Sequence, residues 1–241
     1  MLPPRHRPHA ERPSPDPSTL AGMAELPLFP LGTVLYPGLV LPLHVFEERY
    51  RLMVRELLEA GGDRGSFGVV AIRAGHEVGA DSVSAMYDVG CSADIRQVTP
   101  YDDGRYDLLG TGGRRFRLHS VSTVRPYLVG EVEWLDEEVG DDATVLAAAA
   151  AHAFRGYQRL VAGQDVRAVQ ELPRDPVVLS YLIAAAAVLD VADKHRLLAA
   201  PDAAKRLRLT CGLVRRETEL LRILRAVPAV DLLRGVAISP S

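Results

Sequence analysis

Residues 26–50 read LPLFPLGTVLYPGLVLPLHVFEERY, and this apolar stretch decides the fold. Prolines and glycines interrupt it at six positions: Pro27, Pro30, Gly32, Pro37, Gly38 and Pro42. Each proline removes a backbone donor and fixes φ near about −65°, which excludes both a long helix and one long central strand. We therefore predict short extended pieces that are separated by tight turns. These pieces are Leu26–Phe29, Thr33–Tyr36 and Val40–Leu43.

A helix is expected directly after the last of these pieces, starting near Val45. Its residues at helical spacing are Arg49, Tyr50, Met53, Leu57 and Leu58. Glu47 stands where the first turn favours an acidic side chain, because the helix dipole is positive there. Gly61 and Gly62 are typical of a helix C-terminus, so we expect the helix to end near residue 60.

Strands are predicted to crowd the rest of the first half of the chain. Phe67–Ile72 is short and nearly all apolar, which indicates a strand that is buried on both sides. Ser84–Val98 is a longer and weaker strand, in which Gly90 is interpreted as a bulge. The dipeptide Asp103-Gly104 is the strongest hairpin signal in the sequence.

Two more strands, Tyr106–Gly110 and Arg114–Val121, are expected after that turn. The glycine-rich run between them is predicted to be a second hairpin turn, because it lacks the spacing and the following helix of a phosphate-binding loop. Arg114–Val121 alternates like a half-buried strand, with Phe116 toward the core and Arg115 toward solvent. Tyr127–Leu135 alternates in the same way.

Helices are predicted beyond residue 136. Asp142 stands at an N-cap position, and Asp175 precedes a proline that suits the first helical position. The four predicted helices are an Ala-rich one to about Val161, Val177–Leu189, Asp193–Ala199, and one from Pro201-Asp202 to about Ala226.

The last of these helices is predicted to have two faces. Its apolar face holds Leu209, Leu213, Leu220, Leu224 and Val227. Arg208, Arg215 and Arg222 are spaced seven apart on the opposite face, together with Glu219. We interpret this polar face as an ordinary solvated stripe, because surface helices normally carry one.

Strands followed by helices predict an α+β fold and not a doubly wound sheet. The expected organisation is a disordered, proline-rich leader (1–22), a strand-rich unit (23–137), a helical unit (138–228) and a tail (229–241). The leader holds six prolines and little that could pack. Met23 lies just ahead of the first strand and is a second candidate for the natural start of translation.

Two motifs carry a family resemblance. LPLFPLGTVLYPG followed by LPLHVFEERY closely resembles the opening of the N-terminal, substrate-binding domain of Lon proteases, and DKHRLLAAPDAAKRLRLTCGLVRRETELL resembles its helical half. The resemblance as a whole covers about Leu26 to Arg225. The resemblance implies a partly open, antiparallel, PUA-like β-barrel followed by a helical bundle. It also implies that Glu47, Arg49 and Tyr50 lock the proline-rich stretch onto the barrel.

Composition narrows the function classes. The 241 residues are 48% hydrophobic, which allows a sizeable core, and the net charge of −3 argues against nucleic-acid binding driven by bulk charge. Cys91 and Cys211 fit no zinc or redox spacing and are expected to be reduced and half-buried. Neither a membrane-spanning run of ~18 apolar residues nor a signal peptide occurs in the sequence, so we expect a cytoplasmic protein.

No sequence pattern marks a catalytic, cofactor or metal site. His44 is expected to be partly buried and hydrogen-bonded locally, since no other ligand stands at metal-binding spacing from it. Asp102, Asp103 and Asp107 lack the calcium-loop pattern and are interpreted as a solvated turn. Ser66 lies outside any Gly-x-Ser-x-Gly elbow.

The resulting hypothesis is a non-catalytic module that recognises polypeptides, since the resemblance implies unfolded or degron-bearing chains as ligands. A separate ATP-dependent protease is a candidate partner. Tyr36 and Leu39 are the candidate contact residues. Two alternatives stay open: an RNA-binding module, by analogy with other PUA-like barrels, and a cryptic peptidase. The RNA alternative rests on fold analogy alone, and a one-sided cluster of Arg114, Arg115, Arg117 and Arg125 would favour it.

Overall fold

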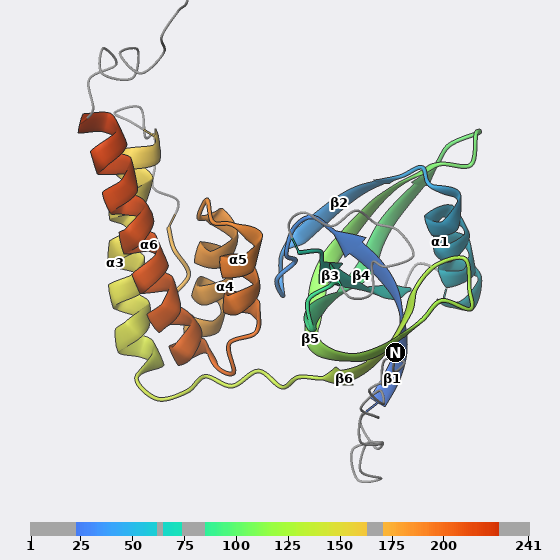
Figure 1. Ribbon diagram of the computed structural model, residues 1–241, viewed down its shortest axis with the longest axis horizontal. Coiled ribbons are helices and arrows are strands. Elements are labelled where there is room, and N and C mark those ends of the chain that lie inside the picture. The colour runs from blue at the N-terminus through green and yellow to red at the C-terminus, as the bar shows by residue number, and fades with distance from the viewer. Residues whose placement is uncertain (1–22, 62–64, 74–84, 163–170, 227–241) are drawn as a thin grey trace, which may run out of the picture.

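The computed structural model describes residues 23–61, 65–73, 85–162 and 171–226. The strands in these ranges are β1 (Met23–Leu31), β2 (Val40–Val45), β3 (Ser66–Ala71), β4 (Val89–Pro100), β5 (Tyr106–Ser122) and β6 (Val129–Trp134). The helices are α1 (Glu48–Gly61), α3 (Ala143–Ala162), α4 (Pro176–Ala186), α5 (Val191–Leu198) and α6 (Ala203–Ala226). Figure 1 shows the strands as a curled sheet beside a helical unit, so the predicted α+β class is confirmed.

The sheet has the strand order β2-β5-β4-β3-β1-β6, and β6 also pairs with β5. β1 changes partner along its length: Met23–Pro27 pairs antiparallel with β6, and Leu28–Leu31 pairs parallel with β3. The expectation of a wholly antiparallel sheet is therefore wrong for β1 and β3. A parallel pair needs a long crossover connection, and the chain between these strands supplies one that contains β2 and α1.

The proline-rich stretch is less fragmented than predicted. β1 continues through Pro27 and Pro30, because Pro27 stands where the pairing switches from β6 to β3. Thr33–Tyr36 forms no strand. α1 starts at Glu48 and not near Val45, because Val45 is buried as the last residue of β2.

The start of α1 contacts the proline-rich stretch through Tyr50. The Tyr50 ring stacks on Phe29 of β1, with ring centroids 4.2 Å apart. The Arg49 guanidinium lies 4.6 Å from the centroid of the Tyr50 ring and donates from Nε to Glu47. The Tyr50–Phe29 stack holds α1 against β1, on the side of the sheet remote from the helical unit (Figure 1), whereas the contacts of Arg49 are local to the start of α1.

The predicted second hairpin turn is wrong, because β5 runs unbroken through the glycine-rich run. Gly112 is needed for a close approach: a Cβ there would collide with the carbonyl oxygen of Tyr36. Gly112 also donates to Leu39 O and accepts from Gly38 N, both at 2.8 Å. The glycine run therefore lets the chain that enters β2 lie directly on β5.

A role in a turn or in a bulge was predicted for two other glycines. Gly104, with φ +79°, lies in the turn between β4 and β5, so the Asp103-Gly104 hairpin is confirmed. Gly90 is not a bulge, since the register shifts of β4 and β5 lie between Cys91 and Ala93 and further along. Gly90 instead leaves room for the Phe116 ring, which a Cβ would meet.

Helices α3, α4 and α6 pack against one another in the helical unit. The Asp175 side chain caps α4 by accepting from Val178 N, as predicted, and α4 ends at Ala186 because the next residue is extended. The apolar face predicted for α6 is wrong in part. Leu213 is buried, but Leu220 is 47% exposed, and the face packed on α3 and α4 instead holds Leu207, Cys211 and Val214.

One hydrophobic core runs from the sheet into the helical unit. It joins Phe29, Tyr36 and Phe67 of the strand-rich part to Tyr181 of α4 and Leu197 of α5. The joint between the two units is therefore a packed interface within the chain.

None of the described helices combines the length and the apolar composition that crossing a lipid bilayer requires.

Candidate functional site: a groove at the joint between sheet and helices

The joint is built around Arg115, in the middle of β5. Its side chain was expected in solvent, but the residue is only 3% exposed. Nη1 donates to the carbonyl oxygens of Leu198 (2.9 Å) and Ala200 (2.6 Å), at the end of α5. Phe116 packs in a hydrophobic cluster with Leu28 and Val132, while Arg115 contacts the helical unit. Two consecutive residues are therefore buried, and the predicted alternation fails here.

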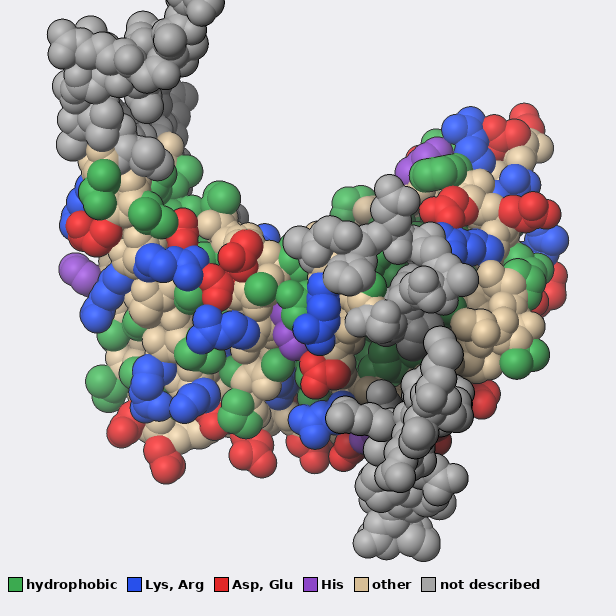
Figure 2. Space-filling view, viewed as in Figure 1, with side chains coloured by type: hydrophobic (Ala, Val, Ile, Leu, Met, Phe, Trp, Pro, Cys, Tyr) green, Lys and Arg blue, Asp and Glu red, His purple; other side chains and the backbone are tan. Residues whose placement is uncertain are grey.

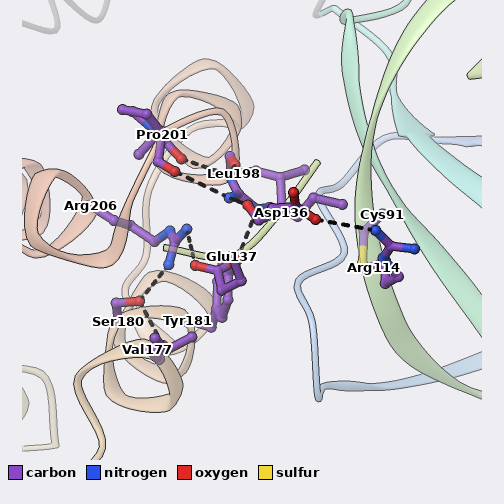
Figure 3. Close-up of polar contacts among 12 residues, drawn as sticks. Cys91, Arg114, Asp136, Glu137, Val177, Ser180, Tyr181, Leu198, Pro201 and Arg206 are labelled. Atoms are coloured by element: carbon purple, nitrogen blue, oxygen red, sulfur yellow. Dashed lines mark hydrogen bonds and ion pairs between the residues drawn. The ribbon is translucent and has the colours of Figure 1, made fainter. Parts of the chain in front are cut away.

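Glu137 links Arg115 to a second buried guanidinium. Its Oε2 accepts from Arg115 Nε at 3.1 Å and from the Tyr181 hydroxyl, and its Oε1 accepts from Arg206 Nη2 at 2.9 Å. Arg206, on α6, is fully buried and also donates to Ser180. Figure 3 shows Glu137 beside Tyr181 and facing Arg206. Residues from β5, α4 and α6 thus meet at one carboxylate.

The Tyr181 hydroxyl stays a neutral donor in this cluster. Burial raises its pKa well above the ordinary range, while the Arg206 guanidinium, 3.8 Å from the centroid of the Tyr181 ring, opposes part of that rise. Removing one member of a buried ion pair leaves an uncompensated charge, which is strongly destabilising. The cluster therefore fixes the position of the helical unit against the sheet.

The two candidate contact residues lie in different environments. Tyr36 is fully buried, and its hydroxyl donates to Lys194 O at 2.9 Å. Its ring centroid is 5.9 Å from that of Tyr181, so Tyr36 joins the two units and does not reach the surface. Leu39 is half-buried and lines a groove.

This joint groove has a volume of about 430 Å³. It lies where β5 changes neighbour from β2 to β6, and α4 forms its far wall. Its apolar walls are Pro37, Leu39, Leu135, Val177, Val178 and Leu182. Arg114, Asp136 and Glu137 supply its polar margin. The valine at position 178 is 53% exposed, so part of the apolar wall is open to solvent.

His195 of α5 lies at the same joint. Its ring stacks on Tyr87, with centroids 4.1 Å apart, and its Nε2 is buried. Asp88 Oδ1 is 3.5 Å from Nε2, a separation too long for a good hydrogen bond. Burial lowers the pKa of His195, and the nearby Asp88 only partly offsets this. Burial at the joint therefore favours the neutral form of this imidazole.

The arginines of the RNA alternative do not form one exposed cluster. Arg115 is buried, Arg117 is exposed, Arg125 pairs with Glu56 at 2.7 Å, and Arg114 lies 3.5 Å from Asp136. Figure 2 shows basic and acidic side chains interspersed over both units on the face it presents. With Arg115 buried, these four residues do not supply the one-sided exposed cluster that would favour RNA binding.

His44 makes hydrogen bonds to its neighbours, as predicted, and its side chain is 46% exposed. Nδ1 lies 2.7 Å from Asp107 Oδ1, and Nε2 lies 3.3 Å from an Arg105 nitrogen. Hydrogen bonds from Tyr101 and His44 lower the pKa of Asp107. The second ring nitrogen of His44 thus faces a guanidinium.

The aspartates of this turn are held by neighbours: Asp103 accepts from the Arg105 backbone N and Nε. Asp102 is exposed. Across the described ranges, no three His, Cys, Asp or Glu side chains are placed together to hold a metal ion.

Comparison with known proteins gives a consistent result. Residues 25–216 match the ATP-dependent protease La (LON) substrate-binding domain. Lon protease 2 of Sorangium cellulosum is 29% identical over 228 residues, which cover 90% of this chain and 27% of that protein. The chain thus spans about a quarter of the length of this relative.

Solved structures agree in fold. The crystal structure of a Lon N-terminal domain protein from Xanthomonas campestris has a TM-score of 0.56 and 25% identity, and covers 85% of this chain and 99% of that one. The N-terminal domain of the Mycobacterium avium complex Lon protease has a TM-score of 0.60 at 22% identity, with 80% and 98% covered, which is a likeness of fold. Because the family match extends over most of its length, the chain belongs to the family of ATP-dependent protease La (LON) substrate-binding domains.

Proposed function

We propose that this protein binds unfolded or degron-bearing polypeptides at the joint groove and does not cut them. The observation that carries the proposal is the apolar wall of Leu39, Leu135 and Val178, which lies open beside a rigid ionic cluster. Apolar grooves with a few fixed polar groups are the usual form of a binding site. Membership of a substrate-binding family supports the choice of polypeptide as ligand.

The bound polypeptide would be extended. Among the described strands β2 pairs only with β5, so its other edge is available to an added strand. Pro42 removes one donor from that edge, so side chains in the groove supply more of the binding than a backbone ladder does. We also interpret the sheet as a partly open barrel of the PUA-like kind, since the β5–β6 pairing closes it and leaves β2 outside.

The non-enzymatic part of the proposal rests on the site itself. The groove is lined by apolar residues, and its polar groups are already paired with one another: Glu137 with Arg115, and Arg114 with Asp136. We propose that a captured chain is passed to a separate ATP-dependent protease in the cytoplasm. Two unpaired, buried cysteines suit such a reducing compartment. Crosslinking in cells should therefore enrich a protease subunit.

The binding test uses a permanently unfolded probe, such as fluorescein-labelled, reduced and carboxymethylated lactalbumin. Fluorescence anisotropy should show binding that Val178→Glu weakens at least about tenfold, because losing a buried valine contact costs about 1.5 kcal/mol. Glu is well tolerated in the first turn of α4, so the variant should fold.

Val188→Glu is the matched control. Val188 is 71% exposed and does not line the groove, so this variant should bind like the unmodified protein. Equal affinities for the two variants would remove the groove as the binding site.

A further inference from the structure

A second groove lies on the helical unit, away from the joint. It has a volume of about 420 Å³ and runs between α3 and α6, which lie side by side in Figure 1. Its lining residues from α3 are Ala149, His152, Ala153, Gly156 and Arg159, and those from α6 are Arg215, Thr218, Glu219 and Arg222. None of them lines the joint groove, so this surface is independent of the proposed polypeptide site.

The floor of this α3–α6 groove is made of small residues. Ala149, Ala153 and Gly156 stand at i, i+4 and i+7, which places them on one face of α3. A Cβ on Gly156 would meet nothing within 4 Å, so the packing of α3 against its neighbours does not require a glycine there. Glycine inside a helix is destabilising relative to alanine. The glycine keeps space free above the floor.

Arginines form the rim. Arg215 and Arg222 are seven residues apart on α6, so about 10.5 Å separates them along the helix axis. Arg159 of α3 adds a third positive charge, against the single carboxylate of Glu219, which accepts from Arg222 at 2.5 Å. The rim thus carries net positive charge on a protein whose total charge is −3.

We propose that the α3–α6 groove docks an acidic α-helix of a partner protein. Carboxylates one heptad apart on that helix repeat at the same rise as Arg215 and Arg222, and the small floor allows close helix–helix approach. A polyphosphate or a nucleic acid fits less well. Glu219 lies in the groove, the protein as a whole is negative, and a small-residue floor offers such ligands no contact.

The steric test substitutes Gly156 by Leu. The probe is a fluorescein-labelled, 21-residue Ala/Leu helix peptide with Glu at every seventh position, and the readout is anisotropy with the full chain. We expect Gly156→Leu to leave thermal stability unchanged or higher and to weaken binding at least tenfold. Gly212→Leu is the control, because Gly212 of α6 is exposed, has free space and lies outside the groove.

The charge test uses the double variant Arg215→Glu with Arg222→Glu. It should weaken binding of the same peptide more than tenfold, whereas Arg208→Glu, on an exposed site outside the groove, should not. A peptide with Lys in place of Glu should not bind. No binding of the acidic peptide, or binding unchanged by Gly156→Leu, would overturn the proposal. Displacement of the peptide by polyphosphate would also overturn the proposal if polyphosphate bound the Gly156→Leu variant as tightly as the unmodified protein.

Discussion

Arg115 Nε of β5 lies 3.1 Å from Glu137 Oε2, just beyond β6, and this ion pair is where the sheet meets the helical unit. The guanidinium is almost fully buried, and the Glu137 side chain is 31% exposed. The same carboxylate also accepts from Arg206, so two buried positive charges depend on it.

Glu137→Ala should therefore destabilise the protein by about 3 kcal/mol, the low end of the range for broken buried pairs, because the carboxylate is partly solvated. The measurement is urea unfolding followed by circular dichroism. Asp136→Ala is the control: its side chain is 91% exposed and lies 3.5 Å from Arg114, so the loss should stay within about 0.5 kcal/mol. Equal losses for the two variants would contradict the role given to Glu137.

Gly112→Ala should cost about 1–3 kcal/mol of unfolding free energy, because the added methyl group meets the Tyr36 backbone. Gly110→Ala lies in the same glycine run, yet its Cβ would find its first neighbour at 3.6 Å, an ordinary contact. Thermal unfolding of both variants tests the unbroken strand. If the run were a turn, as the sequence suggested, the two substitutions would have similar effects.

Stability should fall as the pH drops below about 6.5, in part because of His195. Its pKa is lowered in the folded protein by burial, so the unfolded chain binds the proton more readily. The stabilisation is complete above the unfolded pKa and is lost as pH falls through the folded one. Urea unfolding at several pH values gives the unfolding free energy as a function of pH. The slope of that free energy against pH should be shallower for His195→Gln than for the unmodified protein. A pH dependence of stability that His195→Gln leaves unchanged would contradict this contribution.

Substitutions of Tyr36 and Leu39 should have different effects: the first on the stability of the protein, the second on its affinity for polypeptides. Tyr36→Phe removes the hydrogen bond to Lys194 O, which should cost about 1 kcal/mol of stability and leave affinity for unfolded lactalbumin unchanged. Leu39→Ser should weaken that affinity, because Leu39 lines the joint groove. Anisotropy and urea unfolding of both variants provide the comparison. A loss of affinity in Tyr36→Phe alone would show that the ligand reaches further into the joint.

Local chemistry explains what could be predicted from the sequence. The Asp103-Gly104 turn and the Asp175 cap depend on neighbouring residues, so their patterns indicated them correctly. The buried strand at Phe67–Ile72 was also recognisable, because a short, continuous apolar run is typical of a buried strand.

The joint could not be predicted in this way. Arg115 alternates with Phe116 like a solvent-facing residue. Of the carbonyl groups that accept from it, one stands 21 residues later in the chain and three stand 83 to 86 residues later. Gly112 was predicted to lie in a turn. The segment that requires a glycine there contains Tyr36, which is distant in the sequence, so the local pattern could not reveal it. On α6 the leucine pattern misled because two separate clusters contact the helix, through Leu213 and through Val214.

The most direct measurement places a photo-crosslinker in the joint groove. Val178→Cys, labelled with benzophenone maleimide, gives one reactive position, because Cys91 and Cys211 are buried and burial raises the pKa of both thiols. Val188→Cys, labelled in the same way, is the control. We predict that unfolded lactalbumin crosslinks to position 178 and much less to position 188. Equal yields at the two positions would contradict the assignment of the groove as the polypeptide-binding site.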